Sequence, residues 1–546
     1  MTTTPDPARA AHWAMALTEM PSVTGSEDEA AFAMKLAAML RASPAFADAP
    51  DSVWTIRAEG REGRACVAGL VRGTGRRTVV LTGHFDTVQT GDYGPLQPLA
   101  IAPEALKAAL LEHLDPVAGS EAEKLAHADL SGPDFLPGRG LLDMKSGLAA
   151  GLAVAEAFAA NPEREGNLLF LAVPDEEVNS AGARAAARAL SGIAERLGLE
   201  LEAAINLDAI ADNGDGSYGR AVALGTVGKL LPSAFVVGRA VHASYAVRGV
   251  NAAALAGAIA AAVEWSPDLT EETEGEVGSA PTLLGLRDSK TAYDVTTPES
   301  VWMFWNIATH RRGPEAVLET LDRLVREATG PLLATLRERR LPGDDDAPPP
   351  PAEAAVLTYE ALRAETKARI PDLDERLAVF AGTVAAEGLD LPEQCRRITE
   401  YLWGLSGRAG PAVVLGFASM PYLPTLLDGE PRARRLRAAV EEAARTVGDR
   451  HGAPIAVRSY FPGISDMSFL GDGDEASVPA VAANTPAWGA GISWPEGPAL
   501  AGVPIVNAGP WGRDYHTRLE RLHTPYAFRV LPELLADICR RVLEEA

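Results

Sequence analysis

Two patterns of apolar and polar residues alternate along the first two hundred positions. Short apolar runs at 78–81, 168–173 and 201–210 are typical of buried strands, and small-residue or amphipathic stretches such as 151–160 are typical of helices. Each run ends at or near a histidine or an acidic residue. The alternation predicts an α/β fold, in which ligands and catalytic groups gather at the carboxyl ends of the strands.

The pattern changes at Gly225 and predicts a second domain inserted into the first. A strand, a helix, two strands and a helix from Pro314 follow one another, and a last strand is expected at 355–362, which makes a βαββαβ unit. From Ala412 the first pattern is expected to resume. The predicted domains are therefore 1–218 for the first part of the catalytic domain, 219–405 for the insertion with extra helices, and 406–546 for the second part.

Composition and charge narrow the class of protein. The 546 residues are 47% hydrophobic, enough for a large core, and 50 Lys and Arg stand against 74 Asp and Glu, giving a net charge of −24. This balance argues against a nucleic-acid or membrane partner, since both need concentrated positive charge. The first residues show no signal-peptide pattern and no stretch of eighteen apolar residues occurs, so a cytoplasmic protein is expected.

The cysteines exclude one kind of metal site. There are three, Cys66, Cys395 and Cys539, far apart and odd in number, which indicates neither a disulfide framework nor a Cys-type zinc site. Any bound metal must therefore use histidines and carboxylates.

Adjacent carboxylates follow the apolar run 168–173. Glu176 and Glu177 would raise each other's pKa and resist burial, which is most easily explained if a cation neutralises one and a substrate or water engages the other. The alternative is an ordinary solvated acidic loop, because such pairs are common on surfaces.

Other strand ends carry similar groups. His84 and Asp86 are two residues apart on one side of an extended chain, so Asp86 can hydrogen-bond the ring nitrogen of His84 that does not face a metal. Asp143 precedes a small-residue helix and Asp208 ends another apolar run. Taken singly, the histidine could be structural and Asp143 a helix N-cap.

Together these residues form a ligand set for a metal centre. Two imidazoles and three carboxylates suit zinc, cobalt or manganese, an aspartate can bridge two such ions, and one carboxylate is left as a base. These groups are drawn from the strand-end residues His84, Asp86, Asp143, Glu176, Glu177, Asp208 and His516.

The motifs resemble those of a known family. GHFDTV, GRGLLDMKSG, PDEEVNSAG, NLD, GISD and the H-x-x-x-E of His516 to Glu520 occur in family order across almost the whole chain. They are similar to the motifs of the co-catalytic dinuclear zinc metallopeptidases that include carboxypeptidase G, aminoacylase, peptidase T and succinyl-diaminopimelate desuccinylase. The residues in and around these motifs are most similar to those of the arginine-utilisation (RocB-type) subgroup. The resemblance implies a mixed-sheet α/β/α catalytic domain with a ferredoxin-like lid.

The resemblance also implies the roles of the site residues. Two divalent ions would be bound per chain, zinc first and cobalt or manganese as alternatives, one by His84 and Asp208 and the other by Glu177 and His516. Asp143 would bridge them. Asp86 would orient His84, and Glu176 would be the general base for a metal-bridging water that attacks a scissile amide.

The inserted domain would then be a lid and a dimerisation unit. By resemblance, His242 in Gly238–Ser244 polarises the substrate carbonyl, either in its own chain or across a homodimer. His523 competes with His516 for the last ligand position, and the usual lid arginine for a substrate carboxylate is not evident among residues 306–311. The segment 91–137, with a predicted helix at 103–114, receives no role.

The expected function is hydrolysis of an amide or peptide bond in a small peptide or an N-acyl amino acid. The same chemistry would permit hydrolysis of another C–N bond, such as an amidine or aryl amine. A non-catalytic member that binds a small ligand is the third alternative, and the presence of Glu176 argues against it, since a binder needs no base.

Overall fold

The computed structural model describes residues 4–60, 62–273, 275–340, 348–427, 429–461, 463–494 and 501–544. The chain divides into two compact units. Unit 1 comprises Met1–Thr226, Thr425–Gly473 and Pro498–Ala546, and unit 2 comprises Val227–Pro424 and Asp474–Gly497.

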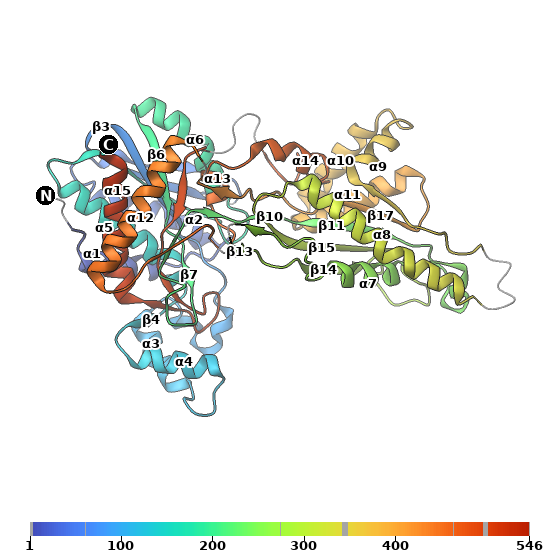
Figure 1. The fold of residues 1–546 in the computed structure, drawn as a ribbon, viewed down its shortest axis with the longest axis horizontal. Coiled ribbons are helices and arrows are strands. Elements are labelled where there is room, and N and C mark those ends of the chain that lie inside the picture. The colour runs from blue at the N-terminus through green and yellow to red at the C-terminus, as the bar shows by residue number, and fades with distance from the viewer. Residues whose placement is uncertain are drawn as a thin grey trace. The chain divides into compact units, whose positions relative to one another are not determined.

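An eight-stranded mixed sheet forms the centre of unit 1 (Figure 1). Its order is β1-β2-β5-β3-β6-β20-β8-β19. The strands are β1 (Val53–Arg57), β2 (Ala65–Arg72), β3 (Thr74–His84), β5 (Glu165–Val173), β6 (Glu200–Asn206), β8 (Ala221–Ala223), β19 (Ala456–Arg458) and β20 (Ile505–Asn507). The pairs β5–β3, β3–β6 and β6–β20 are parallel, whereas β1–β2 and β2–β5 are antiparallel. The predicted α/β class and mixed sheet are confirmed.

Helices cover both faces of this sheet. One face carries α1 (Pro7–Thr18), α2 (Glu27–Ala42), α5 (Ser146–Ala160), α12 (Pro431–His451) and α15 (Leu531–Leu543), whose apolar side chains join one buried cluster with the strands. The other face carries α6 (Ala181–Leu197), which packs against β1, β2 and β5. Because the central strands are covered on both sides, they read as continuous apolar runs without alternation.

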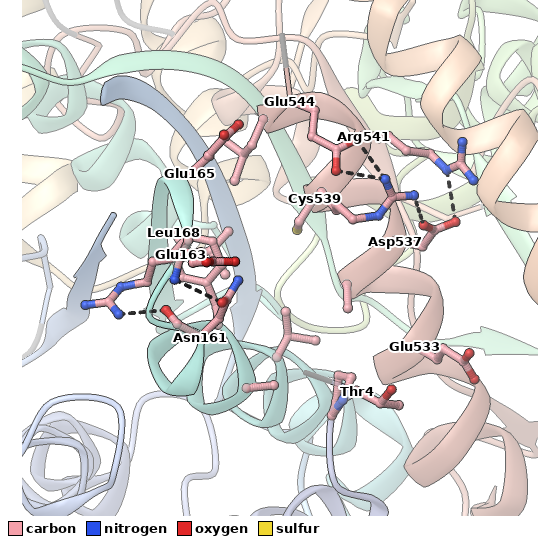
Figure 2. A pocket seen from close by; sticks show the side chains of 18 of the residues that line it. Thr4, Asn161, Glu163, Glu165, Leu168, Glu533, Asp537, Cys539, Arg541 and Glu544 are labelled. Carbon is pink, nitrogen blue, oxygen red and sulfur yellow. Dashed lines mark hydrogen bonds and ion pairs between the residues drawn. The ribbon is translucent and has the colours of Figure 1, made fainter. Parts of the chain in front are cut away.

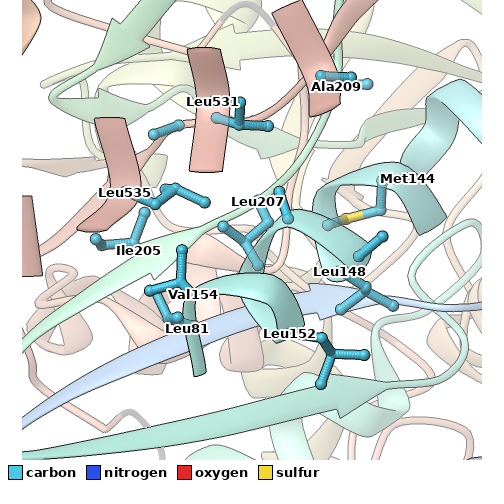
Figure 3. Close-up of a cluster of buried hydrophobic side chains, with 14 of the residues drawn as sticks. Leu81, Met144, Leu148, Leu152, Val154, Ile205, Leu207, Ala209, Leu531 and Leu535 are labelled. Atoms are coloured by element: carbon cyan, nitrogen blue, oxygen red, sulfur yellow. The ribbon is translucent and has the colours of Figure 1, made fainter. Parts of the chain in front are cut away.

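Figure 3 shows the part of this core that supports the strand ends. Leu81 of β3, Ile205 of β6, Leu148 of α5 and Leu531 of α15 belong to one buried hydrophobic cluster. Removing a side chain of this size from such a core costs about 2–5 kcal/mol. The packing therefore fixes β3, β6 and α5 relative to one another, and with them the positions of the strand ends.

The segment after β3 forms a small subdomain of unit 1. It contains η2 (Gly91–Leu99), α3 (Pro103–His113), α4 (Glu121–Ser131) and β4 (Phe135–Pro137), drawn in blue and cyan in Figure 1. The helix predicted at 103–114 is confirmed. β4 joins a second sheet of order β4-β22-β21-β7, with β7 (Ile210–Ala211), β21 (Trp511–Arg513) and β22 (Arg521–His523), so this segment pairs with the C-terminal part of the chain.

Unit 2 is built on a six-stranded sheet. Its path is β10-β15-β11-β17-β16. β10 and β11 pair with successive parts of the same edge of β15, and β14 pairs with the other edge. The strands are β10 (Gly228–Leu230), β11 (Pro232–Val237), β14 (Thr282–Asp288), β15 (Ser300–Thr309), β16 (Ala355–Thr358) and β17 (Ala412–Phe417), and the helices include α7 (Ala252–Val263), α8 (Pro314–Glu338), α9 (Tyr359–Lys367), α10 (Leu373–Ala386) and α11 (Leu391–Ser406). The predicted βαββαβ succession is present as β11-α7-β14-β15-α8-β16.

One of the two predicted domain boundaries, that at 405/406, was wrong, and a further segment of unit 2 was missed. The strand at Ala412 does not return to the first domain, because β17 lies between β11 and β16 in the sheet of unit 2. Unit 2 therefore extends to Pro424, beyond the predicted end at 405, and takes up Asp474–Gly497 as well. All residues of β17 are buried, and an all-apolar run shows that a strand is internal without showing to which sheet it belongs.

Length alone does not make any of these helices a membrane span. Helix α8 has 25 residues, but exposed ion pairs such as Arg326–Asp322 line one of its sides. Within the part of the chain that the structure describes, no helix combines the length and the apolar character that crossing a bilayer requires.

Candidate metal centre

Three neighbouring parallel strands bring their ends to one edge of the unit 1 sheet. β3 ends at His84, β5 is followed by Glu176 and Glu177, and β6 is followed by Asp208. Because β5, β3 and β6 are adjacent and parallel, these side chains converge. The side chains predicted to share a site thus lie together at one edge of the sheet, and their roles stay a prediction.

Asp143 lies at the middle of the cluster. Its Oδ1 is 3.1 Å from Nε2 of His84, and its Oδ2 is 3.0 Å from Nε2 of His516. His516 Nε2 is also 3.2 Å from Oε1 of Glu177. One ligand atom each of His84, Asp143 and Glu177 lies within 4.8 Å of the other two, a spacing that fits a metal ion.

Asp208 and Glu176 border the same histidine. His84 Nε2 is 3.9 Å from a carboxylate oxygen of each, Oδ1 of Asp208 and Oε2 of Glu176. Asp208 sits on a backbone that another segment approaches closely, because a side chain on Gly509 would come within 1.9 Å of the Asp208 carbonyl oxygen. The absence of a side chain at Gly509 is what permits this close approach.

Asp86 holds two parts of the site together. Nδ1 of His84 is 3.0 Å from the backbone carbonyl of Asp86 and 3.6 Å from its carboxylate. The nearest partner of the ring is thus the backbone, not the carboxylate that the sequence predicted, because the chain turns after β3. The buried carboxylate instead accepts hydrogen bonds from the backbone N–H groups of Glu176 and Glu177 and from Thr24.

The environment of Asp143 excludes its alternative role as a helix cap. Helix α5 begins at Ser146 with Lys145 at its N-cap position, and the backbone of Asp143 is extended. Its carboxylate is therefore free to face the two imidazoles rather than the first turn of the helix.

The two candidate C-terminal histidines have different surroundings. His516 faces Asp143 and Glu177, whereas His523 stacks on Trp511 with ring centroids 4.5 Å apart and meets Phe135 edge-on. Burial lowers the pKa of His523 to about 4. The geometry favours His516 as the ligand and gives His523 a packing role.

The charges of the cluster fit a bound cation. Burial, followed by the charge of Asp143, raises the pKa of Asp208 to about 8, and burial raises the pKa of Glu176 well above its ordinary value. Burial opposes protonation of His516, yet its hydrogen bonds with Asp143 and Glu177 raise its pKa to about 10. In the metal-free protein, protons thus neutralise carboxylates that a divalent ion would neutralise instead.

The motif GISD was among those predicted from the sequence, but no role was predicted for its aspartate, Asp466. Asp466 is 1% exposed, burial raises its pKa to about 7, and its charge adds to the raised pKa of Glu176 and Asp208. Its charge therefore acts on Glu176 and Asp208 from a segment distant in the chain, and no local pattern marked it.

A second network supports the glutamate loop. Asp175 adopts a left-handed backbone with φ 70°, and its carboxylate pairs with Nη1 of Arg64 at 2.9 Å. Arg64 also pairs with the buried Glu29 at 2.9 Å. No feature of the sequence connects these three residues, because they belong to separate elements and meet only through the fold.

The metal-free protein should lose stability as pH rises from about 5 to about 8. Asp208 and Asp466 retain protons in the folded state up to pKa values of about 8 and about 7, against an ordinary value of 3.8. The folded state therefore binds more protons in this range, and each group contributes a slope of up to about 1.4 kcal/mol per pH unit. Thermal unfolding in a chelator would measure this, with Asp208→Asn giving a smaller slope; stability that rises with pH over the range would contradict it.

His242 belongs to unit 2 and is exposed. It precedes the turn η4 (Ala243–Arg248), and its Nδ1 accepts a hydrogen bond from the Ser244 N–H at 3.2 Å. Its Nε2 side is thus available for another partner, and its role stays a prediction.

Unit 1 also contains a cavity of about 530 Å³, shown in Figure 2. It is lined by residues from α5, α12 and α15 and by Glu165, which begins β5. The metal cluster follows the other end of that strand, so the cavity is not the active site. Its charged groups are largely paired with one another, as in Arg540 with Asp537 and Glu544.

Known proteins share both this fold and this length. Two Bacillus subtilis proteins are similar over 97% of the chain: the uncharacterized protein YqjN, 31% identical over 95% of its length, and Protein RocB, 28% identical over 94%. A solved structure of a tripeptidase from Staphylococcus aureus matches with a TM-score of 0.51, covering 99% of this chain and 100% of the tripeptidase at 14% identity. At that identity the likeness concerns the fold.

The family match of this chain and its cluster of histidine and carboxylate side chains together define a hydrolase with a candidate metal site. The model of peptidase family M20/M25/M40 matches residues 109–492. The chain belongs to this family. The resemblance inferred from the motifs, including the closeness to RocB, is confirmed.

Proposed function

We propose that the protein hydrolyses an amide or peptide bond in a small peptide or an N-acyl amino acid, with two divalent ions bound per chain. The observation that carries the proposal is the convergence of His84, Asp143, Glu177, Asp208 and His516 around one carboxylate, that of Asp143. Borderline N/O ligands of this kind suit zinc, with cobalt or manganese as alternatives. The occurrence of the same fold in a tripeptidase supports a peptide-like substrate.

In this proposal His84 and Asp208 would hold one ion, Glu177 and His516 would hold the other, and Asp143 would serve both. Bound ions of this type polarise a carbonyl and lower the pKa of water. Asp86 keeps His84 and the glutamate loop in place through its carbonyl and carboxylate. These contacts preorganise the ligands, so little rearrangement is needed on binding.

Glu176 acts as the general base. Its side chain is buried beside His84 but has a different position from Glu177, whose carboxylate faces His516. It removes the proton from the attacking water and delivers it to the leaving nitrogen, so that one carboxyl group serves both half-steps. Burial strengthens its affinity for the proton it must carry between them.

A non-catalytic ligand-binding role is the less supported alternative, since it gives Glu176 no task. Hydrolysis of another C–N bond, such as an amidine or aryl amine, would use the same groups. Turnover of a panel of dipeptides, N-acyl amino acids and amidines by metal-reconstituted protein, with released amine measured, separates the three. Release from no member of the panel, with metal bound, would favour the binding role.

A cytoplasmic location and a part in arginine utilisation belong to this proposal as predictions.

Unit 2 is proposed to be the lid and the dimerisation unit, with His242 as a donor to the substrate carbonyl. His242→Ala should then lower the turnover number by about a hundredfold or more, a typical loss for one oxyanion donor, with the metal content unchanged. His113→Ala is a matched control, because His113 is an exposed histidine of α3. Full activity of His242→Ala would remove this residue from the mechanism.

Complementation distinguishes action within one chain from action across a homodimer. Inactive Glu176→Gln mixed with inactive His242→Ala should regain activity if the histidine acts across the dimer, since one site of each heterodimer has both groups. No recovery after verified subunit exchange would place His242 in the same chain as the site it serves.

A further inference from the structure

The loop that carries His516 has a backbone that needs outside support. Asp514 and His516 adopt left-handed conformations, with φ values of 54° and 64°. A residue other than glycine is strained at such angles and keeps them only where the surroundings enforce them. The loop lies between β21 and β22, so the question is which residues hold it.

The 91–137 segment, for which the sequence predicted no role, supports this loop. Arg521, which is fully buried, donates from Nε to Asp129 of α4 at 2.8 Å and from Nη1 to Asp514 at 2.7 Å. Arg513 donates to the same Asp129 carboxylate at 3.2 Å. Asp129 thus anchors an arginine at each end of the loop, and one of these arginines fixes the left-handed Asp514.

A second contact path reaches His516 itself. The buried Glu520 accepts a hydrogen bond from the His516 backbone N–H at 3.3 Å and another from Arg139 at 2.7 Å. Arg139 in turn donates to Asp92 of the segment at 2.9 Å. The H-x-x-x-E spacing therefore ties the histidine to Asp92 through one glutamate and one arginine.

A third pair lies at the rim of the loop, where Arg518 contacts Glu123 of α4. In addition, β4 pairs with β22, with Leu136 opposite Leu522. Three carboxylates of one segment therefore meet arginines in or next to one loop. Buried ion pairs add little net stability but define a single geometry, since a misplaced loop would leave the charges unpaired.

Resting on the proposed function, we propose that the 91–137 segment is a positioning device that holds the 514–520 loop so that His516 is aimed at the metal centre. Asp92 and Asp129 are positioning residues, and they act on the ion that His516 binds. The segment thereby sets the affinity for one of the two ions rather than taking part in the reaction.

The test is the zinc affinity of Asp129→Asn, measured by competition with a chromophoric chelator. The variant keeps the shape but removes the charge that Arg521 and Arg513 share, so one of the two ions should bind about 10–100-fold more weakly, as is typical for partners behind a metal ligand. Turnover should recover at high zinc with KM unchanged. Glu121→Gln is the control, because Glu121 lies on the same helix, is 93% exposed and pairs with Lys124 of its own helix.

The melting temperature of the metal-free proteins separates positioning from a merely structural role. A lower melting temperature with wild-type zinc affinities would overturn the inference, as would an equal loss of affinity in Glu121→Gln. If Asp129→Asn does not fold, Asp92→Asn carries the test, because Asp92 is partly exposed and reaches His516 by the second path. A wild-type protein that binds no zinc would overturn the proposed function itself, and this inference with it.

Discussion

Glu176→Gln should abolish turnover while the metal content stays close to that of the wild-type protein. Glutamine keeps the shape of the side chain but cannot accept the proton of the attacking water, so the loss should reach at least the roughly 10²–10⁴-fold that a general base contributes. The carboxylate lies 3.9 Å from His84, whereas the neighbouring Glu177 is the glutamate that faces His516. Released amine and bound metal are measured on the same sample.

The neighbouring residue supplies the matched control. Glu177→Gln makes the same chemical change one position along the chain, at a carboxylate that faces His516 at 3.2 Å. It should lower the metal content, and activity should be lost for that reason. Equal metal loss in the two variants would show that the roles of the pair are wrongly assigned.

Asp143→Asn should have the largest effect on metal binding. Its carboxylate contacts His84 on one side and His516 on the other, at 3.1 and 3.0 Å, so its replacement removes a ligand from both ions. The affinity for each should fall by more than the roughly 10–100-fold typical of residues one step behind a ligand. Elemental analysis after reconstitution in excess zinc and removal of free metal would measure the loss.

Asp115→Asn controls for the same substitution elsewhere, because Asp115 is exposed and only accepts backbone hydrogen bonds in a turn. It should retain the wild-type metal content. Two ions per chain in Asp143→Asn would contradict the bridging position and require another residue, such as Asp466, to join the two sites.

The parts of the site that lie at strand ends could be predicted from the sequence. His84, Glu176, Glu177 and Asp208 follow apolar runs in local patterns, and parallel strands bring such positions together by rule. Asp143 and His516 required the family motifs as well, since an aspartate before a helix and a histidine in a loop have ordinary explanations. The structure brings all six together.

The remainder depended on contacts between distant segments, which no local pattern encodes. Asp466 and the Arg64–Asp175 pair come from elements far apart in the chain and meet only in the folded protein. The placement of β17 failed for a related reason, because its apolar residues suit either sheet and only the pairing with β11 decides. The charged residues of the 91–137 segment resembled an ordinary solvated surface until their arginine partners were known.

A titration with metal ions decides whether this chain is a two-metal amide hydrolase. The protein is stripped with a chelator, and zinc, cobalt or manganese is added back stepwise while bound metal and amine released from the dipeptide and N-acyl amino acid panel are measured together. We predict no release without metal, and activity that rises with occupancy and levels off near two ions per chain. Release that is unaffected by stripping, or a protein that takes up no metal and cleaves nothing, would contradict the account.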